Sequence, residues 1–143
     1  MKLAAVCIFL LGAYYQLTQW ADLFPWNNIR DGGQPVLLIA VIGVLSVVLA
    51  VILWLGWKEG AFAAVMGLGV WGWFEFQQWW APWFGGATPE WTRQYEARFA
   101  DTVHWIGASE GSPSPDANHI VLHVLIAVAL FASLSGLVAR RSI

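Results

Sequence analysis

Charged residues are scarce in this sequence. Only 11% of its 143 residues are Asp, Glu, Lys or Arg, whereas a soluble globular domain carries about 25%. The surface of a soluble domain must be covered by charged and polar side chains, and this chain has too few charges for its size. The composition therefore excludes a soluble enzyme. The 59% of hydrophobic residues exclude a disordered tail. No run of Lys or Arg is present either, which excludes a nucleic-acid-binding protein.

Cysteine and histidine are also rare. Cys7 is the one cysteine, so a disulfide within the chain and redox chemistry of the CxxC type are excluded. A haem inside a helical bundle usually takes histidines from two helices, one on each side of the porphyrin. His119 and His123 are expected on one helix and His104 in a loop, so haem is not expected as a cofactor.

Long apolar runs take the place of the missing charges. They fall at about residues 3–20, 35–57, 60–84 and 119–139, and each is long enough to cross about 30 Å of hydrocarbon as a helix. The first run resembles a secretory signal but lacks its cleavage pattern, so we expect a retained span. The sequence therefore predicts an all-α integral membrane protein: a four-transmembrane-helix bundle forming a single membrane domain over residues 1–143.

The basic residues indicate the orientation of this bundle. Lys2, Lys58, Arg140 and Arg141 flank one side in short segments, whereas the other three basic residues are spread over two longer loops. By the positive-inside rule, both termini are expected in the cytoplasm of a bacterium, with the protein in its inner membrane. Seven of the nine acidic residues then fall on the outer side.

The outer segment between the third and fourth runs has its own helical pattern. Thr88 is a capping hydroxyl, Pro89 follows at the first helical position, and Glu90 lies near the positive end of the helix dipole. Apolar side chains then recur every four residues, with charged and polar side chains between them. This pattern predicts an amphipathic helix over about residues 89–105, lying on the membrane surface or capping the bundle.

Tryptophan and small residues are distributed unevenly. Seven of the 11 tryptophans belong to the outer side, which is typical of an aromatic belt at the membrane interface. A sharper interpretation is an aromatic wall around a lipid, quinone or pigment. Small residues gather in the inner halves of the third and fourth runs, where they favour close helix packing. We therefore expect a bundle that is tight inside and opens outward.

Polar side chains from three runs are expected to converge in that outer half. His119 and His123 lie one turn apart, and with Glu75 they are candidate ligands of a divalent metal ion. Asp116, three residues before His119, is expected to orient its ring. The candidate ligand-binding residues around this site are Gln16, Gln19, Trp71, Gln78, Trp79 and Trp83.

Several functions fit these residues. No catalytic motif favours an enzyme, so the leading hypothesis is a non-catalytic membrane protein whose outward-facing pocket binds a metal ion or small ligand. One alternative is an accessory subunit that packs its tryptophans against a larger membrane complex, and a homo-oligomer is equally compatible. A second alternative is a membrane enzyme acting on a lipid, with Glu75 as general base. The same groups would also serve as a proton relay or a hydrogen-bonded pin between helices.

Overall fold

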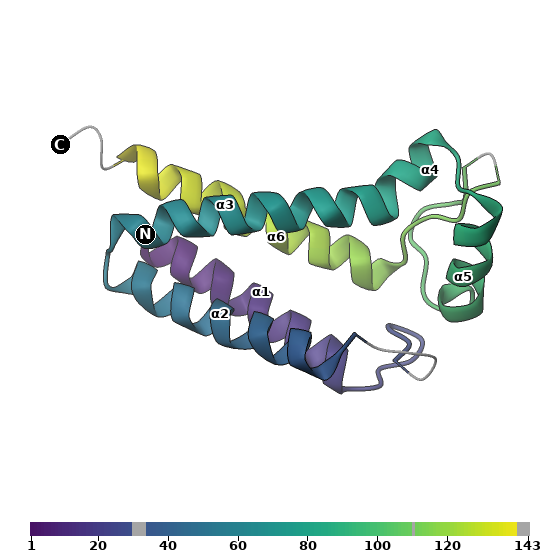
Figure 1. Cartoon of the computed structure of the whole chain (residues 1–143), viewed down its shortest axis with the longest axis horizontal. Coiled ribbons are helices and arrows are strands. Elements are labelled where there is room, and N and C mark those ends of the chain that lie inside the picture. The colour runs from purple at the N-terminus through teal and green to yellow at the C-terminus, as the bar shows by residue number, and fades with distance from the viewer. Residues whose placement is uncertain (30–33, 110, 140–143) are drawn as a thin grey trace.

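The computed structural model describes residues 1–29, 34–109 and 111–139, and these parts are helical apart from loops and one isolated bridge between Ser109 and Ser112. The elements are α1 (Lys2–Trp20), α2 (Val36–Trp54), α3 (Lys58–Glu75), the π-helix η1 (Phe76–Trp80), α4 (Ala81–Gly85), α5 (Pro89–Phe99) and α6 (Ala117–Ala139). Figure 1 labels the six α-helices. The predicted all-helical class is confirmed for the described residues.

Three helices, α1, α2 and α6, are long and apolar enough to cross a membrane. Their composition supports the prediction of a membrane protein. The third expected span is divided among α3, η1 and α4, which follow one another without a gap. Arg140 and Arg141, on which part of the predicted orientation depends, lie outside the described residues.

The connection between α2 and α3 is a tight turn. Gly56 has a φ of 87°, a left-handed conformation that costs a residue with a side chain about 1–2 kcal/mol. The second helix therefore stops at Trp54, three residues before the end of the predicted apolar run. Helix α3 begins directly after the turn, at Lys58, and the two helices diverge from there (Figure 1).

Helices α1 and α6 share the centre of the packing, because α1 packs against both α2 and α6, and α6 packs against both α1 and α3. A Cβ on Gly12 of α1 would lie 2.5 Å from the Cβ of Ser46 in α2. A Cβ on Gly60 of α3 would lie 2.2 Å from Cγ2 of Ile52. These glycines let the helices approach closely, as small residues do in membranes. Gly67 and Gly69, by contrast, have no neighbour within 4 Å of such a Cβ.

Helix α5 is held beside the ends of the long helices by the loops around it (Figure 1). Thr88 accepts a hydrogen bond from the backbone N–H of Trp91 at 3.2 Å, as its predicted capping role requires. The helix ends at Phe99 instead of extending to residue 105. Both the backbone N–H and the hydroxyl of Thr102 bond to the Phe99 carbonyl and turn the chain. Val103 then donates to the carbonyl of Pro25 at 2.9 Å, which fixes the loop after α5 to the loop after α1.

Candidate functional site

The site begins with the π-helix, which changes the direction of two neighbouring tryptophans. Ala81 donates its backbone N–H to the carbonyl of Phe76, five residues back, so this turn holds one residue more than an α-helical turn. Pro82 explains the wide turn, because proline has no N–H to donate and its ring clashes with the carbonyl four residues back. As a result Trp79 contacts His119, whereas Trp80 contacts His123.

Glu75 and His123 form the first of two carboxylate–imidazole pairs. Nε2 of His123 lies 3.2 Å from Oε2 of Glu75, and Trp71 donates its indole N–H to Oε1 at 2.9 Å. Trp80 donates to Nδ1 of His123 at 2.8 Å. Because Nδ1 accepts, the ring proton belongs on Nε2, and a neutral imidazole donates to the carboxylate. The pair joins α3 to α6.

Asp116 and His119 form the second pair. Asp116 is fully buried, and its Oδ1 accepts from both the backbone N–H and Nδ1 of His119 at 2.9 Å each. The first bond caps α6 and the second fixes the imidazole. The ring also packs on Trp79, with centroids 3.7 Å apart and planes inclined by 31°, and against the edge of Phe99. Nε2 of His119 is left without a hydrogen bond to any described residue.

The two pairs are neighbours, with the centroids of the His119 and His123 rings 6.5 Å apart. Each carboxylate, however, is hydrogen-bonded to its own imidazole, and both nitrogens of His123 are occupied. Within the described ranges, no group of three or more His, Cys, Asp and Glu side chains is arranged to hold a metal ion. The predicted contact of Asp116 with the His119 ring is present, as is the proximity of Glu75 and His123.

Two adjoining hollows beneath α5 make up what we call the outer recess, a name that follows the predicted orientation. They share Gln78, Trp79, Arg98 and Phe99 as lining residues. The larger hollow, of about 730 Å³, lies between η1 and α5, and its other lining residues are Gln77, Trp91, Gln94, Tyr95 and Ala97. The smaller, of about 70 Å³, is polar, and its other lining residues are Thr18, Gln19, Asn27, Asn28, Ile29, Gln34, Asn118 and His119.

The aromatic side chains of α5 hold this helix against η1. Tyr95 is buried, stacks on Trp91 with centroids 5.1 Å apart, and meets the edge of Trp79 at 5.9 Å. Its hydroxyl donates to the carbonyl of Ser114. Burial raises the pKa of the Tyr95 hydroxyl well above its ordinary value, and the negative charge of Asp116 adds to the shift. The hydroxyl therefore stays a donor, and α5 stays docked.

Of the six predicted ligand-binding residues, Gln19, Gln78 and Trp79 line the outer recess. The other three make contacts within the protein. Gln16 donates to the carbonyl of Ile39 at 2.8 Å and accepts from Trp20 at 2.9 Å, so it joins α1 to α2. Trp71 bonds to Glu75, and Trp83 donates to the carbonyl of Gly107 at 3.1 Å.

Some recess residues were not expected from the sequence. Gln94, Arg98 and Trp91 come from α5, whose amphipathic pattern predicts a helix without showing where it docks. Asn118 is oriented by Tyr14, whose hydroxyl donates to the Asn118 Oδ1 at 2.8 Å. No short-range sequence signal marks that pair, since 104 residues separate its members.

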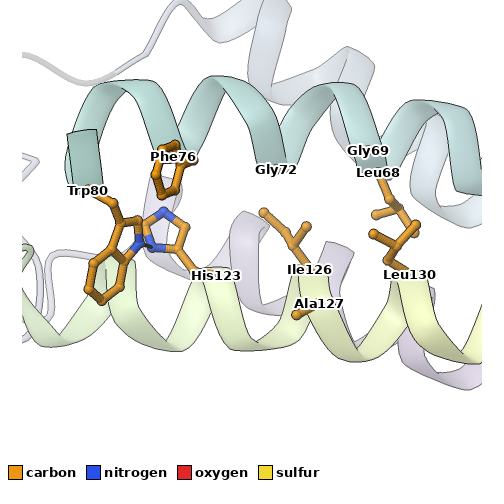
Figure 2. Close-up of a pocket in the computed structure, with 9 residues that line it drawn as sticks. All are labelled: Leu68, Gly69, Gly72, Phe76, Trp80, His123, Ile126, Ala127 and Leu130. Carbon is orange, nitrogen blue, oxygen red and sulfur yellow. Dashed lines mark hydrogen bonds between the residues drawn. The ribbon is translucent and has the colours of Figure 1, made fainter.

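A separate apolar groove of about 260 Å³ lies between α3 and α6 (Figure 2). Trp80 and His123 point toward one another at one end, and Leu68 and Leu130 face one another at the other. Gly69 lines it without a side chain. One end of the groove is therefore closed by Trp80 and His123, which are joined by the hydrogen bond from the Trp80 indole N–H to Nδ1 of His123.

The outer recess combines flat aromatic faces with side-chain amides, an imidazole and a guanidinium group. A mainly apolar wall with a few convergent polar groups is typical of sites that bind small organic molecules. The chain matches no known protein family, and no curated protein or solved structure is significantly similar to it.

Proposed function

We propose that this is a small polytopic membrane protein that binds a small organic ligand in the outer recess. The observation that carries the proposal is the lining of that recess. Gln19 and Gln78 make no hydrogen bond to the described residues, and their amide groups border the same space as the imidazole of His119. Trp79 is only 5% exposed and forms the wall between the two hollows. Unpaired amides beside a rigid aromatic wall favour a ligand with both polar and apolar faces.

We further propose that α3, η1 and α4 together form a fourth span, with both termini in the cytoplasm of a bacterium and the recess outside. Lys2 and Lys58, the first residues of α1 and α3, support this orientation through the positive-inside rule, which would put α5 on the outer side. Single cysteines at Glu59 and Ala100 in a Cys7→Ala background test it, since both positions are exposed. A membrane-impermeant maleimide applied to intact cells should label Ala100→Cys and not Glu59→Cys; the reverse pattern overturns the orientation.

Native mass spectrometry tests ligand binding. Protein extracted from its own membranes should carry a bound mass beyond that of the chain, and Gln78→Leu should lose it, because Gln78 lines both hollows. Gln78 is exposed, so its replacement leaves the core intact. Glu96→Leu is the matched control, an exposed residue of α5 outside the recess, and should keep the bound mass. Wild-type protein without any bound mass contradicts the proposal.

A divalent metal ion is a second candidate, favoured by the hydrogen bond between Asp116 and His119. A carboxylate that holds Nδ1 of a histidine is the usual support of a metal-bound Nε2, and Nε2 of His119 is free in the polar hollow. Such an ion would complete its coordination with amide oxygens or water. Elemental analysis of purified protein should then find zinc or a similar ion at one per chain, lost in His119→Gln. Equal metal content in wild type and His119→Gln would contradict this second proposal.

A further inference from the structure

We propose that the outer recess recognises a neutral sugar ring with neighbouring free hydroxyl groups, carried by a membrane glycolipid or free in solution. This inference rests on the proposed function and names the class of its ligand. It is drawn from the larger hollow between η1 and α5, which aromatic and amide side chains line together. Neither kind of group alone distinguishes a sugar from other ligands, but the combination does.

The aromatic side of the hollow suits the apolar face of a pyranose. Trp79, Trp91, Tyr95 and Phe99 all line it, and they brace one another. Trp79 makes edge-to-face contacts with Trp91, Tyr95 and Phe99 at centroid distances of 6.5, 5.9 and 5.2 Å. The C–H groups on one face of a sugar ring carry small positive charges, whereas an aromatic face is negative, so the two pack together. Trp79 and Tyr95 are themselves buried, so the half-buried rings of Trp91 and Phe99 offer the contact surface, and packing on Trp79 and Tyr95 holds them in place before a ligand arrives.

The amide side suits the hydroxyl groups. Gln77 and Gln78 come from η1, Gln94 comes from α5, and all three line the hollow. The NH₂ group of Gln94 already donates to Glu90 at 2.7 Å, so its carbonyl oxygen is the part left for a ligand. A glutamine amide has a carbonyl acceptor and an NH₂ donor, and each sugar hydroxyl also both donates and accepts. Neighbouring hydroxyls can therefore pair with one amide through two hydrogen bonds. Gln77 and Gln78 form no hydrogen bond with the described residues, so these groups remain available.

Charge points to a neutral ligand. Carboxylates are missing from the described lining of the larger hollow, and its charged member is Arg98, whose guanidinium lies 5.3 Å from the centre of the Phe99 ring. This position repels a cationic ligand. The buried carboxylate of Asp116 lies behind His119 and opposes a strongly anionic one. The other polar groups of this lining are glutamine amides, the Tyr95 hydroxyl and tryptophan indole N–H groups, all of them neutral.

Size and position agree with a sugar headgroup. The larger hollow, of about 730 Å³, is within the range of about 300–1,000 Å³ that holds small organic ligands. It lies beside α5, at the end of the membrane helices where the headgroup of a glycolipid would be. The adjoining polar hollow of about 70 Å³ has room for water that bridges to His119 and Gln19.

Saturation-transfer NMR tests the inference. The protein is purified in an amine-oxide detergent, since maltoside detergents carry sugar, and is placed in phosphatidylcholine nanodiscs. Maltose is the free probe, and a monoglucosyl diacylglycerol in the nanodisc is the lipid probe. We expect saturation transfer to the pyranose protons of at least one probe, with affinity falling about tenfold in Gln78→Leu through the loss of one or two hydrogen bonds.

The controls separate a specific site from general effects. Trp91→Leu should weaken binding by a similar factor because it removes part of the aromatic wall. Trp57→Leu and Glu96→Leu should not, since both side chains are exposed and outside the recess. Binding of the glucolipid alone identifies a lipid headgroup as the source, and binding of maltose shows that the free sugar is sufficient.

Two results overturn the inference. One is the absence of saturation transfer to both probes, and the other is equal binding by wild type, Gln78→Leu and Trp91→Leu. If sugars fail while the protein still retains a native bound mass that Gln78→Leu removes, the proposed function stands and the sugar assignment is wrong. If that native mass is also absent, both fail together.

Discussion

Replacing Glu75 by glutamine is expected to destabilise the protein, although the two side chains have nearly the same shape. The Glu75 carboxylate accepts from two donors, Nε1 of Trp71 at 2.9 Å and Nε2 of His123 at 3.2 Å. Both neighbours must donate, because Nδ1 of His123 is already occupied by the N–H of Trp80. An amide has one acceptor oxygen, so one of the two donors would face an NH₂ group. A buried donor without an acceptor costs about 1–3 kcal/mol, which is the expected loss in the free energy of unfolding.

Unfolding in mixed micelles of increasing dodecyl sulfate content, followed by far-UV circular dichroism, measures this loss. A double-mutant cycle with Trp71→Phe tests its cause. In wild type, Trp71→Phe removes a favourable hydrogen bond to Glu75. In the Glu75→Gln variant, the same substitution removes a donor for which the amide has no acceptor left. The double variant should therefore be more stable than the sum of the single changes by about 1 kcal/mol. The lost packing of Trp71 is common to both backgrounds and cancels.

The reasoning would be refuted if Glu75→Gln unfolded like wild type, or if the two changes were additive. An independent readout is the position of the ring protons. In ¹⁵N-histidine NMR spectra, His123 should carry its proton on Nε2, because Trp80 donates to Nδ1. Neutral His119 should carry it on Nδ1, because Asp116 accepts there. The same tautomer at both residues would show that one of the two hydrogen-bond patterns is absent.

Three further predictions concern packing and the outer loop. Gly12→Ala should lower the free energy of unfolding by about 1–3 kcal/mol, because its Cβ would lie 2.5 Å from α2; Gly67→Ala, with nothing within 4 Å, should not. Gly86→Ala should cost about 1–2 kcal/mol from its φ of 90°, whereas Gly85→Ala should cost nothing in the same assay. Tyr95 has a raised pKa, so stability should be constant up to a pH near its ordinary pKa of 10.0 and fall above it. Tyr95→Phe should remove that part of the alkaline fall, and an unchanged pH profile would contradict it.

The helices of this protein could be predicted because each depends on a property of its own residues. Apolar runs of sufficient length mark α1, α2 and α6, and Thr88 with Pro89 marks the start of α5. The Asp116–His119 contact could also be predicted from the sequence, since two residues three positions apart at the start of a helix lie on the same face. The proximity of Glu75 and His123 could be predicted because both are ionisable groups in apolar helices, where such groups pair to avoid the cost of burial without a partner.

The rest depends on geometry that the sequence does not show. The π-helix arises because one hydrogen bond shifts from the fourth to the fifth residue, and no hydrophobic period records such a shift. The shift sends Trp79 and Trp80 to different histidines, so the predicted single cluster becomes two pairs. Gln16 illustrates a second limit. Its polarity suggested a pocket, but a carbonyl of the neighbouring helix α2 is within reach and takes its amide.

The extra residue in the Phe76–Trp80 turn also sets how this region can change during evolution. Deleting one residue from the turn would restore an ordinary α-helix and leave the helical segments on either side in nearly their present relative orientation, because the wide turn already absorbs the extra residue. The change would be confined to the turn itself, where Trp79 and Trp80 would move to different positions around the helix axis. One of the two tryptophan–histidine contacts would be lost, while every residue type in the site was still encoded. Related chains should therefore tolerate substitutions around this turn more readily than a single-codon deletion within it.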